Sequence, residues 1–149
     1  MLGLAFSIGR DRFALRCADV VEVVPRVNLR DIPHAPRSVA GMFTYRGAVV
    51  PVVDLCQLLW QTPAADRMST RIIVVRHAKT KLVGLLAERV TEAVNLDPAR
   101  ATASGIAVDD APYLGEVYFD DAGMIQLLRL DEIVGGAIGR MLSSDEGVR

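Results

Sequence analysis

The sequence predicts an all-β protein arranged as two similar lobes. Apolar residues alternate with small or polar ones along much of the chain, which is the pattern of half-buried strands. Short segments rich in Gly, Asp and Pro separate these stretches, as turns separate strands. Two stretches, Gly47 to Leu55 and Gly123 to Asp131, both run from a turn glycine through an apolar strand to an aspartate that can open a helix. This repetition favours two β-lobes within the 149 residues.

The first hairpin is predicted at the N-terminus. Leucine, phenylalanine and isoleucine alternate with small residues over residues 2–8, and residues 9–12 supply a turn. A second strand then continues through a β-branched run to Val24, where Pro25 interrupts it. A proline-containing loop follows, because prolines lack a backbone donor and bias the preceding residue to extended conformations.

A second hairpin is predicted from Gly41 to Tyr45 and from Ala48 to Val53, and its turn contains Arg46 and Gly47. An arginine is a poor resident of a buried strand pair, since its guanidinium is always charged and costs several kcal/mol to bury unpaired. We therefore expect Arg46 to lie on the turn, with its stem covering apolar surface and its charge reaching solvent or a partner.

A short helix is predicted after this hairpin, where Leu55, Leu58 and Leu59 share one face. Asp54 is expected to cap it, with Gln57 completing a capping box. The polar residues 61–69 are the expected boundary between halves, which gives a first lobe of about residues 10–66 and a second of about 67–134, possibly with the N-terminal strand.

The second half is predicted to repeat the hairpin theme. Residues 70–75 and 82–90 form one hairpin, and residues 113–119 and 124–130 form another around the turn at 120–123. The Ala-rich segment before the last hairpin is expected to be loop. Apolar residues recur at helical spacing from Asp131 to Leu142, which predicts a terminal helix, and residues 135–149 are assigned to the C-terminal helix and tail.

Composition argues against several functional classes. The 17 basic and 18 acidic side chains give a net charge of −1, so no strong field attracts nucleic acid. No apolar run approaches the roughly 20 residues that span a bilayer, and direct membrane insertion is not expected. Two cysteines are too few for a disulfide framework, and no export signal is visible, so the expected location is the cytoplasm.

Chemistry-bearing motifs are scarce, and no catalytic residue, metal site or cofactor is predicted. His34 and His77 lack a Cys or His at metal-ligand spacing. Cys17 and Cys56 lie in apolar runs, where a buried inert thiol is the simpler interpretation. A binding module is therefore favoured over an enzyme. The alternative is a small β-barrel enzyme or small-molecule binder that uses a cleft between the lobes.

Several motifs together resemble the CheW-like domain of bacterial chemosensory proteins over about residues 2–134. They are the strand VVEVV, the segment IPHAPRSVAGMFTYRGAVVPVVDL, the pair RIIVV and LVGLLAERVTEAV, and YLGEVYFDDAGMIQLLRLDEI. The resemblance implies two small SH3-like five-stranded β-barrels packed side by side. It also implies an adaptor that links the cytoplasmic tip of chemoreceptors to the regulatory domain of the histidine kinase CheA, with possible self-association in arrays at the inner membrane.

The resemblance also implies which residues contact each partner. The receptor-binding residues would be Val20, Glu22, Val23, Gly41, Arg46 and Gly47. The kinase would be contacted from the second lobe, through Leu82, Gly84 and Leu86. The chain departs from the family pattern at Thr44-Tyr45, where Asn-Leu is usual, and at Glu88, where Asp is usual. These departures leave the identity of the partners, and a flagellar or other output, open.

Overall fold

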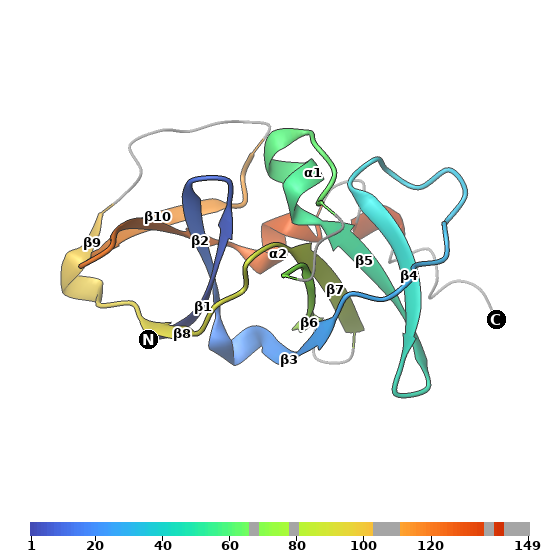
Figure 1. Cartoon of the computed structure of the whole chain (residues 1–149), viewed down its shortest axis with the longest axis horizontal. Helices are drawn as coiled ribbons and strands as arrows, with labels where there is room; N and C mark the ends of the chain where they lie inside the picture. Colours follow the sequence, from blue (N-terminus) through green and yellow to red (C-terminus); the bar gives the residue numbers. More distant parts are fainter. Residues whose placement is uncertain (66–68, 78–80, 103–110, 136–138, 142–149) are drawn as a thin grey trace.

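The structure is a computed structural model of the chain, and it describes residues 1–65, 69–77, 81–102, 111–135 and 139–141. Strands dominate it and form two sheets that lie side by side (Figure 1). The all-β expectation is therefore confirmed. The helical segments named in the described residues are short: η1 (Cys17–Asp19), α1 (Leu55–Trp60), η2 (Pro98–Arg100) and α2 (Leu130–Ile133).

The two sheets define a terminal lobe, built from both ends of the chain, and a middle lobe. The terminal lobe contains β1 (Leu2–Ile8), β2 (Asp11–Arg16), β8 (Ala93–Asn95), β9 (Ala101–Thr102), β10 (Leu114–Asp120) and β11 (Gly123–Leu128), in the order β8-β1-β2-β11-β10-β9. The middle lobe contains β3 (Val20–Pro25), β4 (Val39–Tyr45), β5 (Ala48–Asp54), β6 (Arg71–His77) and β7 (Lys81–Ala87), in the order β3-β6-β7-β5-β4.

Both lobes repeat one pairing scheme. In the terminal lobe the hairpins β1–β2 and β10–β11 join through the parallel pair β2 and β11. In the middle lobe the hairpins β6–β7 and β4–β5 join through the parallel pair β7 and β5. The repeated sequence segments therefore occupy equivalent positions, since β5 leads into α1 and β11 leads into α2.

The strand pairing divides the chain at other places than the sequence suggests. The expected boundary at residues 61–69 lies inside the middle lobe, because β6 pairs with β3 and β7 pairs with β5. The second predicted strand is also interrupted: η1 separates β2, in the terminal lobe, from β3, in the middle lobe. A local sequence pattern reveals hairpins, but it does not reveal that hairpins distant in the sequence pair in parallel. The predicted boundary between the lobes is wrong for this reason.

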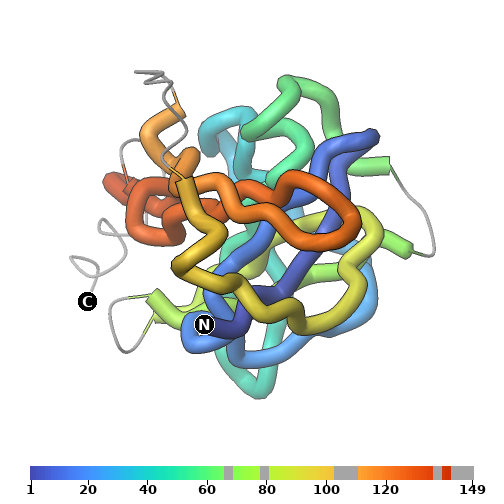
Figure 2. Tube along the Cα trace, turned by 90° about the vertical axis from the view of Figure 1, so that its left-hand side faces the viewer, coloured from blue at the N-terminus to red at the C-terminus, as the bar shows by residue number. Residues whose placement is uncertain are grey.

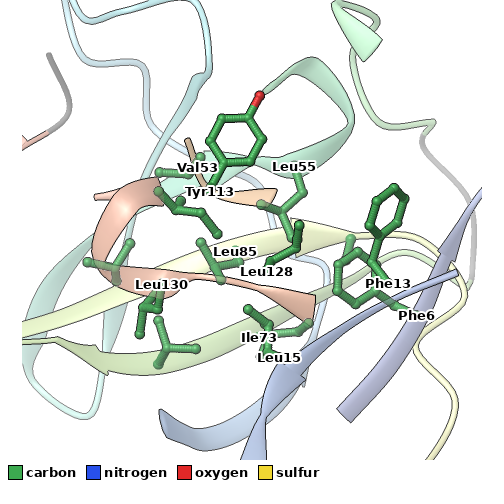
Figure 3. Packing of buried hydrophobic residues seen from close by; sticks show 14 of the residues in the cluster. Phe6, Phe13, Leu15, Val53, Leu55, Ile73, Leu85, Tyr113, Leu128 and Leu130 are labelled. Atoms are coloured by element: carbon green, nitrogen blue, oxygen red, sulfur yellow. The ribbon is translucent and has the colours of Figure 1, made fainter. Parts of the chain in front are cut away.

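One hydrophobic core joins the two lobes, and each lobe also has its own smaller core. Figure 3 shows the joint core, in which side chains of both sheets and of the helices meet. Alternation along a strand divides its residues between cores: on β6, Ile73 and Val75 belong to the joint core, and Ile72 and Val74 to the core of the middle lobe. The continuous apolar run of β6 follows from burial on both faces.

Two predicted segments differ from their expectation. The segment expected to be loop before the last hairpin contains η2 and the two-residue strand β9, which pairs with β10. The predicted terminal helix begins one residue early: α2 covers Leu130–Ile133, and residues 139–141 are again helical. Residues 136–138 and 142–149 of that prediction lie outside the described residues.

Candidate functional site

The turn of the β4–β5 hairpin places Arg46 at the surface. Tyr45 and Ala48 are paired, so Arg46 and Gly47 form a two-residue turn, and their φ angles are 49° and 83°. Two positive φ values in succession are typical of the hairpin turn that matches the strand twist. Gly47 adopts this conformation without a Cβ penalty, and Arg46 adopts it at a cost on the order of 1 kcal/mol. The side chain of Arg46 is 74% exposed, as the sequence predicts for a turn.

Arg46 takes part in a group of three side chains, which we call the Glu22 cluster: Glu22, Tyr45 and Arg46. The Tyr45 hydroxyl donates a short hydrogen bond to Oε1 of Glu22. The Arg46 guanidinium donates to the same oxygen over 2.9 Å, and its carbon lies 5.3 Å from the centroid of the Tyr45 ring. The carboxylate and the ring thus hold the arginine in one orientation.

The Glu22 cluster also joins the two edges of the middle lobe. Glu22 lies on β3 and Tyr45 on β4, and these strands occupy opposite ends of the sheet order. The backbones of Arg30 and Met42 exchange two further hydrogen bonds beside this junction. The sheet therefore curls until its edges meet, as in a small barrel.

The hydrogen bond from Tyr45 shifts the titration of both partners. It lowers the pKa of Glu22, an effect that the nearby positive charge of Arg46 reinforces and desolvation opposes. The same bond raises the pKa of Tyr45, because ionised tyrosine could no longer donate to the carboxylate. At neutral pH the cluster therefore contains an ionised glutamate, a protonated tyrosine and a charged arginine, and it has no net charge.

The remaining residues predicted to bind the receptor lie near the Glu22 cluster but differ in accessibility. Val23 is 37% exposed on edge strand β3, whereas Val20 is half-buried against the joint core. Gly41 is buried, with φ of 148°, and a Cβ there would lie 2.7 Å from the carbonyl oxygen of Arg30. The role of Gly41 in this structure is thus to admit the Arg30 backbone alongside β4.

The residues predicted to contact the kinase do not form an accessible surface, and this expectation needs correction. Gly84 and Leu86 are buried, and Leu82 is half-buried. Leu86 and Leu82 pack in the core of the middle lobe, and a Cβ on Gly84 would lie 2.9 Å from Ile72 and 3.0 Å from Val52. Strand β7 also belongs to the lobe that carries the Glu22 cluster, not to a second lobe.

Asp54 caps α1, as the sequence predicts, and it also binds the backbone that follows the helix. Its Oδ1 accepts hydrogen bonds from the backbone N–H groups of Cys56, over 2.9 Å, and Gln57, over 3.2 Å. Its Oδ2 accepts from the N–H of Ala64 over 2.8 Å, which ties down the chain after the helix. Glu88, the other departure from the family pattern, accepts from the N–H of Ala65 over 2.7 Å.

Tyr45 is the functional candidate that sequence reasoning missed. In the sequence it stands out only as a departure from the family pattern before the Arg-Gly pair. A tyrosine ring has an apolar body and a polar tip, so a tyrosine at the inner end of a hairpin beside an arginine suggests a partner for its hydroxyl. Its partner, Glu22, lies 23 positions away in the sequence, and local pattern does not reveal that proximity.

The described residues offer little catalytic or metal-binding chemistry. No group of three or more His, Cys, Asp or Glu side chains there is arranged to hold a metal ion. Burial raises the pKa of the Cys56 thiol to about 12, so this thiol remains protonated and is a poor nucleophile. Ser104, Gly105 and the acidic pair Asp109-Asp110 lie outside the described part of the chain.

The protein is a two-lobed β protein, in which two curled sheets share one core. Its most distinctive surface feature is the Glu22 cluster, which presents Arg46 at a hairpin turn. The chain belongs to the CheW-like domain family, whose model matches residues 2–137.

Individual relatives agree with this assignment. The chain is 30% identical over 132 residues to the chemotaxis protein CheW of Rhizobium meliloti, covering 87% of this chain and 84% of that protein. It is 26% identical over 136 residues to the chemotaxis protein CheW of Helicobacter pylori, covering 88% and 79%. It is 34% identical over 89 residues to a probable chemotaxis protein CheW of Rhizobium etli, covering 60% of this chain but only 57% of that protein.

The fold has a close counterpart among solved structures. The scaffolding protein TtCheW from Thermoanaerobacter tengcongensis superimposes with a TM-score of 0.81, at 24% identity, over 92% of this chain and 89% of that one. The fold of two SH3-like lobes expected from the resemblance is thereby confirmed, although in the described residues the sheet of the terminal lobe has six strands and not the expected five. In the described residues, no helix has the length and apolar character needed to cross a bilayer.

Proposed function

We propose that this chain is a non-enzymatic coupling adaptor of a bacterial chemosensory pathway. It binds the cytoplasmic tip of a chemoreceptor and the regulatory domain of the histidine kinase CheA, in the cytoplasm and at receptor arrays on the inner membrane. Membership of the CheW-like family supports this proposal, as do relatives named chemotaxis protein CheW. No cofactor is required for such a role.

The receptor-facing surface in this proposal is centred on the Glu22 cluster. The observation that carries it is the exposed guanidinium of Arg46, held by Glu22 and Tyr45. A guanidinium fixed in one orientation suits a partner helix that presents carboxylate or amide groups. Three further residues, Val20, Gly41 and Gly47, support this surface indirectly, because they shape β3, β4 and the turn, respectively.

In this proposal the kinase does not bind to the buried residues of β7. Of the three β7 residues that the resemblance implies as kinase contacts, only Leu82 is partly accessible. Gly84 and Leu86 then act by maintaining the core beneath the Glu22 cluster, which shares their lobe. Contact between copies of the chain in an array remains part of the proposal.

Co-elution tests this function directly. The full chain is mixed with a soluble chemoreceptor tip fragment and with the isolated CheA regulatory domain, and each mixture is passed over a size-exclusion column. The proposal expects a complex in both binary mixtures and a larger one when all three proteins are present. Elution of the chain as a separate species in both binary mixtures would contradict it.

A further inference from the structure

A second surface of the molecule has the properties of a binding site. A pocket of about 550 Å³, which we call the α1 pocket, lies between the two lobes. Its walls are the end of α1, the turn between β1 and β2, and the β10–β11 hairpin with the residues before it. Its volume falls within the range of roughly 300–1,000 Å³ that is typical of ligand pockets. Its apolar lining includes Phe13, Leu59, Trp60, Tyr113, Leu114 and Met124.

The α1 pocket and the Glu22 cluster lie at opposite ends of the molecule. In Figure 1, α1 and the β1–β2 turn lie at the top and the β4–β5 turn lies at the bottom. Figure 2, turned by 90° about the vertical axis, shows the same separation. The two sites share no residue. One partner at each site is therefore compatible with the fold.

Two exposed apolar side chains flank the α1 pocket, one from each lobe. Trp60 of α1 is 53% exposed, and Met124 of β11 is 59% exposed. Phe119, also exposed, is paired directly opposite Met124 across the hairpin, so the apolar surface continues outward from the pocket. Tryptophan and methionine are enriched where proteins bind other chains, because they offer large contact areas and methionine adapts its shape.

The charges around the pocket decide what kind of occupant suits it. The Arg12 guanidinium donates two hydrogen bonds to the Asp120 carboxylate, both over 2.8 Å, so this pair is neutral. Arg10 and Asp11 add one charge of each sign. The rim therefore offers donors and acceptors without an excess charge. A peptide backbone is complementary to such a rim, because each amide both donates and accepts, whereas a free anion or cation is not.

We propose that the α1 pocket is a second docking site, which takes a short, electrically neutral peptide segment of a partner protein. The segment inserts apolar side chains between Trp60 and Met124, and its backbone contacts the charged rim at Arg10 and Asp11. This site is independent of the receptor-facing surface and gives the adaptor a position for an additional protein.

Trp60 is the only tryptophan of the chain, so its fluorescence reports occupancy of this pocket alone. The probe is a displayed library of random 12-residue peptides, selected on the full-length protein, from which the best binders are synthesised. We expect binders rich in apolar residues and low in net charge, and a shift of Trp60 emission to shorter wavelength when they bind. Met124→Glu should weaken binding at least tenfold. Val49→Glu, which also places an acid at an exposed apolar position, should bind as wild type.

The proposal is overturned if the selected peptides leave the Trp60 emission unchanged, or if Met124→Glu binds them with wild-type affinity. It is also overturned if only strongly charged peptides are recovered, or if the aromatic dye anilinonaphthalene sulfonate binds the pocket and no peptide does. Thermal unfolding checks that Met124→Glu is folded, and Ala122→Glu, on the same wall, replaces it if it is not. Receptor binding is not part of the readout, so failure here leaves the adaptor function untouched.

Discussion

The β4–β5 turn and strand β7 look alike in the sequence but differ in the structure. Each has a glycine among apolar residues, at Gly47 and at Gly84, and each is part of a segment that the family resemblance assigns to a partner. Around Gly47, a Cβ would meet nothing within 4 Å. Around Gly84, it would meet Ile72 and Val52 at 3.0 Å or less. The first glycine serves an exposed turn, and the second serves close packing of the core.

Position in the sheet explains the difference. Strand β7 lies between β6 and β5, and its two faces contribute to the joint core and to the core of the middle lobe. Strand β4 lies at the edge, and its turn projects beyond the sheet. A partner can contact the turn without disturbing the fold, whereas it reaches the buried residues 83–87 of β7 only if the lobe opens. Accessibility, rather than motif membership, therefore separates contact residues from supporting ones.

The largest expected effect comes from filling the space at Gly84. We expect Gly84→Val to lower the free energy of unfolding by about 3 kcal/mol, because its side chain overlaps the stiff β-branched Ile72 and Val52. Gly47→Ala is the matched control and should cost only about 1 kcal/mol, the penalty of a Cβ at positive φ. Urea unfolding measures both values. A folded Gly84→Val with wild-type stability that fails to bind the kinase regulatory domain would restore β7 as a contact surface.

The next effect concerns Asp54, which supports the fold beneath the hairpin. Asp54→Ala removes the acceptor of the N–H groups of Cys56, Gln57 and Ala64, and we expect it to lower the free energy of unfolding by about 2 kcal/mol. Asp54→Asn keeps one carbonyl acceptor and should cost less. Both variants should bind receptor and kinase in proportion to their folded fraction. Full stability together with loss of one partner would show a direct contact role for Asp54.

A smaller effect is expected within the Glu22 cluster. Tyr45→Phe removes the hydroxyl that donates to Glu22 and should lower the thermal midpoint less than Asp54→Ala does. It should weaken receptor binding, because Arg46 loses part of its support. Phenylalanine keeps the ring beneath the guanidinium, so the loss should be smaller than that caused by removing the arginine. Equal loss in both variants would show that the hydroxyl, not the charge, carries recognition.

The smallest effect is a pH dependence. The folded-state pKa of Glu22 lies below its usual value, so ionised Glu22 stabilises the native state above that usual value. This contribution is lost as the pH falls through the lowered pKa of the folded state. The stability of Glu22→Gln, which cannot ionise, should therefore fall less steeply on acidification than that of the wild type. Parallel stability curves for the two proteins, measured by urea unfolding across the acid range, would contradict this assignment.

Much of the local structure was predictable from the sequence, and the long-range arrangement was not. The turn at Arg46-Gly47, the Asp54 cap and the N-terminal hairpin follow from residue types and spacing. The parallel pair β5 and β7 joins residues about 30 positions apart by contacts that no local period encodes. The family resemblance implied that Glu22 and Arg46 belong to one site, but the local pattern did not reveal that Tyr45 links them, or that Gly84 is buried.

The central claim is that Arg46 contacts a partner and is not required for the fold. The most direct test is titration of a soluble chemoreceptor tip fragment with wild type, Arg46→Glu and the control Arg100→Glu, an exposed arginine on η2. We expect Arg46→Glu to weaken receptor binding at least tenfold with a nearly unchanged thermal midpoint and with binding to the kinase regulatory domain retained, and Arg100→Glu to bind as wild type. Wild-type receptor affinity of Arg46→Glu, or its unfolding, would contradict the claim and make Arg46 a structural turn residue.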